Sequence, residues 1–266
     1  MIGILIAVAA VIITFLLKGV SPVILINLPS IFIVIVGSTG AVIASFGMDN
    51  FKRVPKLLGI ATKTYKSNAV ATRVQLVEFT DRARRAGLLD LEKDVEAVPD
   101  AFLKHGLQMV IDGMEPETVE EVMTLEIESL KTRHAVGHQI WALWSGYAPT
   151  FGILGAVMGL IAVMAHLSEP EKLGAGIQVA FIATLLAVGL ANILFMPMSV
   201  ALKQRTSLEV AEKEMALAGI LALQAGDHPR VVAQKLDTFL TPAQRASIPE
   251  KGSPAAAAAG AAAEAA

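Results

Sequence analysis

The fold follows from one apolar stretch, residues 141–167, which reads WALWSGYAPTFGILGAVMGLIAVMAHL. It contains no Asp, Glu, Lys or Arg, and it is longer than the roughly 20 residues that cross a lipid bilayer as an α-helix. Trp141, Trp144 and Tyr147 lie at its start, and aromatic rings of this kind typically anchor a helix at the membrane–water interface. The stretch therefore predicts a transmembrane helix that begins near Trp141.

Three further apolar runs have similar character: residues 2–17, 28–46 and 177–200. Short turns separate the first run from the second and the third from the fourth, and turns this short join antiparallel helices. No basic segment precedes the first run and no small-residue cleavage site follows it, so we expect a retained membrane helix and not a signal peptide. We predict an all-α integral membrane protein, with four transmembrane helices in two hairpins and a helical cytoplasmic domain between the second and third.

The composition supports this class. The chain is 54% hydrophobic and 17% charged, which is too apolar for an ordinary soluble domain. Its formal net charge of -2 gives no basic footprint, so we expect no nucleic-acid partner. Cysteine is absent, and no phosphate-binding loop, metal-ligand spacing or nucleophile motif is present. We therefore predict no enzyme, no catalytic residue, no metal site and no cofactor.

Positive charge near the predicted spans sets their orientation. Only Lys18 and Lys172 lie in the short turns of the hairpins. The positive-inside rule therefore places both termini and the middle of the chain in the cytoplasm. The basic residues on that side are Lys52, Arg53, Lys56, Lys63, Lys131, Arg133, Lys203, Arg205 and Lys213.

Apolar residues recur at helical spacing in the middle segment, within residues 76–88, 98–110 and 119–130. We expect a helix to begin at Pro116, and the helix of the fourth span to continue through residues 207–224, before a last helix that ends near Leu240. The predicted domains are a transmembrane hairpin (1–47), a cytoplasmic helical domain (48–139), a second transmembrane hairpin (140–201), cytoplasmic C-terminal helices (202–252) and an alanine-rich disordered tail (253–266).

No span contains Asp, Glu, Lys or Arg in its interior. An ion-translocating protein normally needs an ionisable group at membrane depth, where such a group is costly and persists for function. His166, at the outer end of the third run, is expected to be an interfacial structural residue and not a proton relay. This absence argues against a self-sufficient pump.

Small and hydroxylated residues are frequent in the spans instead, and most are expected to let the helices pack closely. Pro149 and Pro197 are more specific, because each lies at the cytoplasmic end of a span, where bending transmits force to the adjoining domain. Thr184 is the best hydroxyl for a transient ion contact, with bonding to its own helix as the alternative. The charged stretch 81–96 fits either a solvated helix pair or an electrostatic docking face.

Five stretches carry a family resemblance: RRAGLLDLE (84–92), GLQMVIDG (106–113), GYAPTFGILGAVMG (146–159), residues 184–197, and QAGDHPR (224–230). In this order the chain resembles the MotA/PomA family of flagellar stator proteins over nearly its whole length before the tail. The glycine pattern of the third span alone also occurs in the related ExbB/TolQ family.

The resemblance implies a homo-oligomer, a pentamer, in the bacterial inner membrane, surrounded by lipids and enclosing the helices of a MotB-like dimer. That partner would span the membrane once and carry the intramembrane aspartate that binds the ion. By resemblance, Arg84 and Glu92 contact the rotor switch protein FliG. Pro149 and Pro197 couple ion flow to motion, and Thr184 lies beside the partner's aspartate.

Sodium-type members of the family resemble one another in having threonine where this chain has Ala156. Sodium needs several oxygen ligands, so we expect H+ as the transported ion and favour Na+ less. We thus predict a stator subunit that forms a proton channel with its partner and converts ion flow into torque. Two alternatives remain: an ExbB/TolQ-type energiser of envelope transport, against which the additional amino-terminal hairpin argues, and a non-energised membrane scaffold or passive channel.

Overall fold

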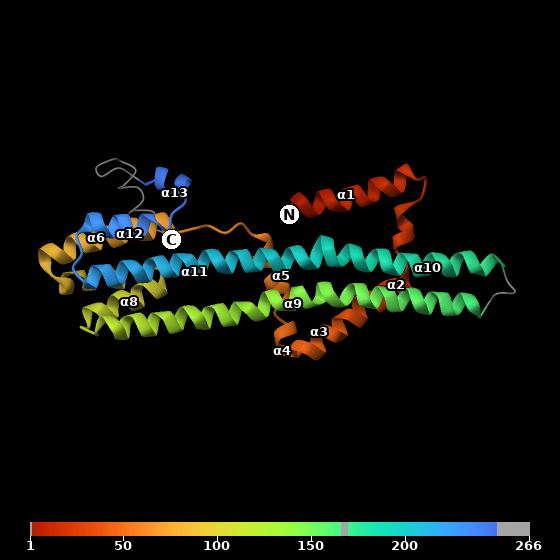
Figure 1. The fold of residues 1–266 in the computed structure, drawn as a ribbon, viewed down its shortest axis with the longest axis horizontal. Helices are drawn as coiled ribbons and strands as arrows, with labels where there is room; N and C mark the ends of the chain where they lie inside the picture. The colour runs from red at the N-terminus through yellow and green to blue at the C-terminus, as the bar shows by residue number, and fades with distance from the viewer. Residues whose placement is uncertain (1, 166–169, 249–266) are drawn as a thin grey trace. The chain divides into compact units, whose positions relative to one another are not determined.

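The structure, a computed structural model, describes residues 2–165 and 170–248. These residues form helices joined by short connections, with no strand among them (Figure 1), which confirms the all-α prediction. His166 and the tail 253–266, for which the sequence predicted an interfacial role and disorder, lie outside the described residues.

The described residues divide into two compact units, residues 2–64 with 133–165 and 170–205, and residues 65–132 with 206–248. The domain boundaries derived from the sequence stay predictions. Elements wholly in the first unit are α1 (Ile2–Leu17), η1 (Pro22–Leu25), α2 (Leu28–Ile31), η2 (Phe32–Gly37), α3 (Ser38–Phe46), α4 (Met48–Phe51), α5 (Val54–Thr62), α10 (Pro170–Gly189) and η4 (Leu190–Phe195).

The second unit holds its own elements, and two long helices, α9 (Pro116–Met164) and α11 (Met196–Gln224), contribute residues to both units. The elements wholly in the second unit are α6 (Ala69–Ala86), η3 (Leu88–Leu91), α7 (Glu92–Glu96), α8 (Ala101–Ile111), α12 (Pro229–Asp237) and α13 (Pro242–Ala246).

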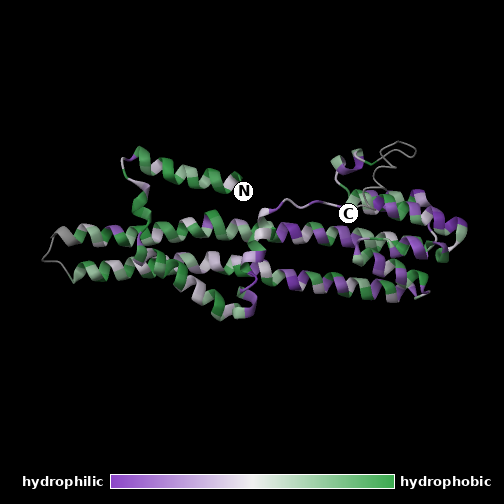
Figure 2. Cartoon of the chain, turned by 180° about the vertical axis from the view of Figure 1, so that it is seen from behind, coloured by the Kyte–Doolittle hydropathy of each residue, from purple (hydrophilic) through white to green (hydrophobic). Residues whose placement is uncertain are grey.

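Three helical segments among the described residues are long and apolar enough to cross a membrane: Leu28–Phe46, Pro116–Met164 and Leu173–Gln224. The first helix, α1, has 16 residues, or roughly 24 Å at 1.5 Å per residue, which is shorter than the bilayer's hydrocarbon core. None of its described side chains is buried in the chain, and hydrophobic residues predominate along it (Figure 2). A helix that is apolar on all sides and uncovered by its own chain suits a lipid or protein environment.

Two of the apolar segments contain π-helical turns that the sequence did not predict. The second span is broken by η2 into α2 and α3, and η4 separates α10 from α11. Pro197 gives a physical reason for η4, because a proline ring lacks the N–H of a regular helix and clashes with the carbonyl four residues before it. The wider turn is visible in the hydrogen bond from the Met196 N–H to the Ala191 carbonyl.

The sequence assigned residues 119–130 and 141–167 to different domains, but the structure joins 119–130 and the described part of the third run in one helix, α9. No proline separates them and Gly137 is their single intervening glycine, so no strong signal ends the helix. The predicted start at Pro116 and the continuation of the fourth span to Gln224 are confirmed. The helix α8 begins after the cap Asp100, whose carboxylate accepts the Leu103 N–H.

The second unit has a hydrophobic core of its own. Leu76, Leu107, Met123 and Ile220 are each at most 1% exposed, and they come from α6, α8, α9 and α11. A methyl group added at Gly106 would lie 2.7 Å from the Ile220 Cδ1, so this glycine sits where two helices pack closely. The middle segment is therefore a packed helical unit and not a flexible loop.

Candidate functional site

Close contact between α9 and α10 sets the geometry around the predicted ion pathway. A methyl group added at Gly152 would collide with the Cβ of Ala187, and one added at Gly159 would lie 3.1 Å from the Cβ of Ala180. Larger side chains at these two glycines would push the helices apart, so small residues are what allow this approach. At Gly152 and Gly159 the structure therefore confirms the packing role that the sequence predicted for the small residues of the third span.

Thr184 lies on α10 at this contact, with its Cα 3.4 Å from the methyl carbon that Gly152 lacks. Its side chain is half-buried, and its hydroxyl donates to the Ala180 carbonyl at 3.4 Å, which is long for an O–H···O hydrogen bond. The local bond that the sequence left as an alternative is thus present but weak. Ala156, one turn beyond Gly152 on α9, offers only a methyl group.

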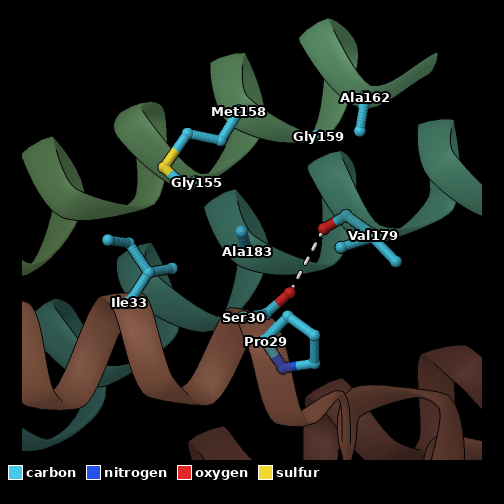
Figure 3. A pocket seen from close by; sticks show the side chains of 9 residues that line it. All are labelled: Pro29, Ser30, Ile33, Gly155, Met158, Gly159, Ala162, Val179 and Ala183. Carbon is cyan, nitrogen blue, oxygen red and sulfur yellow. Dashed lines mark hydrogen bonds between the residues drawn. The ribbon is translucent and has the colours of Figure 1, made fainter. Parts of the chain in front are cut away.

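An apolar groove of about 230 Å³ lies beside this contact, between the second span, α9 and α10 (Figure 3). The Ser30 hydroxyl lies at its edge, donating to the Val179 carbonyl at 3.3 Å and lying 2.8 Å from the Asn27 Oδ1. None of the groove's lining residues is ionisable, so the groove holds no candidate acid. They are Pro29, Ser30, Ile33, Gly155, Met158, Gly159, Ala162, Val179 and Ala183.

The two candidate coupling prolines are half-buried in different helices. Pro149 lies inside α9, and Pro197 is the second residue of α11, directly after the π-helical turn. Each proline removes one backbone hydrogen bond from its helix, and kinks in helices typically occur at such points. A hydrogen bond of 2.8 Å from the Ser199 hydroxyl to the His138 carbonyl joins α11 to α9. The helices that carry the prolines are therefore linked within the first unit.

The tryptophans do not act as the lipid-interface anchors that the sequence predicted. Trp141 is 3% exposed and Trp144 is 8% exposed, both inside the first unit. Their rings pack against Phe195 of η4 and against each other, because helix packing turns this side of α9 toward η4. Tyr147 is half-buried, and its hydroxyl lies 3.0 Å from the Ser45 hydroxyl.

Arg84 and Glu92, the candidate rotor contacts, are both exposed on the second unit. Arg84 lies in the last turn of α6, Glu92 begins α7, and Gly87 between them has φ +92°, which favours glycine. The Arg84 guanidinium donates to the Gly226 carbonyl at 3.3 Å. Glu92 makes no ion pair with any described residue.

Neighbouring charges in the same stretch are paired with one another. Arg82 lies 3.1 Å from an Asp90 carboxylate oxygen and 2.6 Å from one of Asp94, and Arg85 pairs with Asp81 at 2.8 Å. The hydrogen bond with Asp90 contributes most to raising the pKa of Arg82, although partial burial opposes it. Arg84 and Glu92 take no part in these pairs, and both side chains stay exposed.

The sequence missed the contact between Arg84 and the turn 224–230. Both lie in stretches that carry the family resemblance, but 142 residues separate Arg84 from Gly226. Gly226 has φ +72°, and Asp227 anchors the turn by pairing with Lys235 at 2.7 Å. No local pattern signals this contact, because it depends on how α6 and α12 pack.

Known proteins resemble this chain along nearly all of its length. Residues 94–215 match the model of the MotA/TolQ/ExbB proton channel family. Motility protein A of Bacillus subtilis (strain 168) is 38% identical over 253 residues, 95% of this chain and 94% of the relative. Motility protein A of Borreliella burgdorferi is 37% identical, covering 84% of this chain and 85% of the relative.

The fold is also similar to a solved structure, that of the flagellar MotAB stator complex from Bacillus subtilis. The TM-score is 0.86 at 38% sequence identity, and the match covers 94% of this chain and 98% of the other chain. Sequence and fold therefore agree over the same extent.

Proposed function

This chain belongs to the motility protein A group of the MotA/TolQ/ExbB proton channel family, and from that membership we infer that it is a flagellar motor stator subunit. It is a membrane protein that forms an ion channel with a MotB-like partner and converts ion flow into torque on the rotor. The observation that carries this function is the match in sequence and fold, over nearly the whole chain, to a stator complex.

The finer topology is part of the proposal. Four spans cross the bacterial inner membrane, with α1 as the shortest and both termini in the cytoplasm. Support comes from α1, which is uncharged, predominantly apolar and unburied, and from the basic residues that follow the second and fourth spans and precede the third. A span of roughly 24 Å is accommodated by local thinning of the bilayer or by contact with neighbouring helices.

The channel is assigned to a pentamer of this chain around a MotB-like dimer whose aspartate binds the ion. The spans of this chain contain no Asp, Glu, Lys or Arg, so the titrating acid has to come from another polypeptide. Large apolar side chains stay exposed along α9 and α10, where copies, partner helices and lipid can cover them: Ile153, Val157, Ile161, Phe181 and Leu185.

The transported ion is assigned as a proton. Thr184 offers a hydroxyl at the helix contact, whereas Ala156 supplies no oxygen ligand, and the adjoining groove is lined mainly by apolar side chains. A sodium ion needs several oxygen ligands, while a proton needs only the carboxylate that carries it.

The mechanism turns on the cost of burying a charge. Protonation of the partner's aspartate removes a charge that a low-dielectric channel disfavours, which lets the ring of subunits step around it. Bending at Pro149 and Pro197 passes the step to the second unit. The exposed charges of Arg84 and Glu92 then engage FliG on the rotor, where opposed charges fix the register of contact.

The test expresses the chain with its own MotB-like partner in a bacterium that lacks stator genes, and measures rotation of tethered cells. We expect torque with both proteins, and none when the partner's intramembrane aspartate is replaced by asparagine. Torque from the chain without the partner, or torque that survives the aspartate replacement, would contradict the proposed function. Membrane levels of both proteins, measured by immunoblot, are the control.

A further inference from the structure

Four aromatic residues form a cluster in the first unit, here called the aromatic cluster: the buried Trp141, Trp144 and Phe195, and the half-buried Phe51. The Trp144 ring stacks on Phe195, with centroids 4.6 Å apart and an interplanar angle of 17°. It also lies 5.6 Å from Trp141 and 5.8 Å from Phe51. Trp144 is thus the central ring, and it joins α9 to η4 and α4.

One hydrogen bond extends the cluster to the second span. The Trp144 Nε1–H donates to the Ser38 hydroxyl at 2.9 Å, and both groups are buried. The Ser38 hydroxyl in turn donates to the Val34 carbonyl inside the π-helical η2. In contrast, the Trp141 Nε1–H is buried without a partner among the described residues. The two tryptophans therefore belong to the same cluster, but only Trp144 makes a side-chain hydrogen bond, and only Trp144 stacks on Phe195.

The cluster lies close in sequence to both candidate coupling prolines. Trp144 precedes Pro149 by five residues, and Phe195 ends η4 two residues before Pro197. A proline leaves a gap in the hydrogen-bond ladder, so the bend at that point is set by side-chain packing around it. Trp144 directly precedes Ser145, whose carbonyl would accept the N–H that Pro149 lacks, and its ring stacks on Phe195, two residues before Pro197.

We propose that Trp144, Phe195 and Ser38 are positioning residues for the coupling step. The stack of Trp144 on Phe195 holds the two proline-containing helices at one relative bend, and the bond to Ser38 fixes the plane of the Trp144 ring. When the ion-binding acid changes its charge and the helices bend, this stack has to shift. The inference rests on the proposed function, because the motion that it positions is the stator's own.

The first experiment compares Trp144→Phe with Trp141→Phe in the full chain, assembled with its partner. Each substitution removes the same atoms, but only Trp144→Phe breaks a hydrogen bond. We expect Trp144→Phe and Ser38→Ala to lower stall torque by a similar fraction. One neutral hydrogen bond corresponds to about a fivefold change in the equilibrium between bends.

The Trp144→Phe/Ser38→Ala double variant should lose no more stall torque than either single variant. The stall torque of Trp141→Phe should stay near that of the unmodified chain. Equal losses for Trp141→Phe and Trp144→Phe, or additive losses in the double variant, would overturn the positioning role. Immunoblots of membrane levels separate these outcomes from loss of folding.

The second experiment uses fluorescence, because the chain has 2 tryptophans and both lie in the cluster. The Trp141→Phe variant reports on Trp144 alone, after subtraction of the spectrum of a complex that lacks both tryptophans. We expect the Trp144 emission to change when the partner's aspartate is replaced by asparagine, and to follow pH when the aspartate is present.

Identical Trp144 emission for aspartate and asparagine complexes would overturn the inference. The outcome is distinguishable from failure of the proposed function, because in that case the unmodified complex itself would give no torque. An active unmodified complex with an unresponsive Trp144 contradicts the inference alone.

Discussion

The contact between α9 and α10 predicts a graded response to one methyl group added along α9. At Gly146 the added Cβ would meet nothing within 4 Å, at Gly159 it would lie 3.1 Å from the Cβ of Ala180, and at Gly152 it would collide with Ala187. Alanine in a helix interior gains about 0.5–1 kcal/mol over glycine. Overpacking costs about 1–3 kcal/mol. Gly146→Ala should therefore stabilise the chain, Gly159→Ala should change little, and Gly152→Ala should destabilise it.

The difference in stability between the Gly152→Ala and Gly146→Ala variants isolates the overpacking cost, because both variants gain the same helix propensity from alanine. Unfolding of the purified complex, followed by thermal melting, should place Gly152→Ala below the unmodified chain and Gly146→Ala at or above it. Gly59→Ala in α5 is a second open-space control, since nothing lies within 4 Å of the added methyl group. Equal melting temperatures for Gly152→Ala and the two controls would refute the close approach of the helices at Thr184.

Three further predictions concern the surface, the ion and pH. Charge reversal at Arg84 or Glu92 should reduce torque while changing the free energy of unfolding by less than about 0.5 kcal/mol, because both residues are exposed. The matched reversal at Arg85, which breaks its pair with Asp81, should leave torque nearer normal. Unchanged swimming in every Arg84 and Glu92 variant would count against the rotor contact. Swimming speed should be the same in buffers with and without sodium, and loss of motility on sodium removal would reverse the ion assignment. Burial is the main cause that lowers the pKa of His138 below its ordinary value, and the charge of Lys203 adds to it. At this residue the folded chain therefore binds fewer protons than the unfolded chain. The contribution of His138 to stability is present above about pH 6.5 and is lost as the pH falls below that value. His138→Gln should flatten that acid limb of a melting-temperature profile, and an identical profile would contradict it.

Long apolar runs without charges made the membrane helices predictable, because a bilayer imposes length and composition directly on the sequence. The start of α9 was equally readable, since Pro116 follows Gly113 and lies among acidic residues. The fusion of residues 119–130 with the third run into one helix was not predicted, because the change from polar to apolar composition resembled a boundary although no residue there ends a helix.

The candidate site was predictable in its residue types and not in its contacts. The glycines of α9 and the prolines carry local signals, whereas the burial of Trp144 against Phe195 depends on packing between distant segments. The same tryptophans satisfy the pattern of an interfacial anchor, so that pattern predicted the wrong role for them. Of the two π-helical turns, η4 has a sequence signal in Pro197, whereas η2 has no proline in it or directly after it to signal it.

Proton flux into liposomes tests the central claim most directly, namely that an uncharged sleeve of helices takes its titrating acid from another polypeptide. Three preparations are compared under the same imposed proton gradient. They are the chain alone, its complex with the MotB-like partner in a form that conducts ions, and the same complex with the partner's aspartate replaced by asparagine. We predict flux from the complex with the aspartate and background flux from the other two. Flux from the chain alone at the rate of the complex would contradict the account.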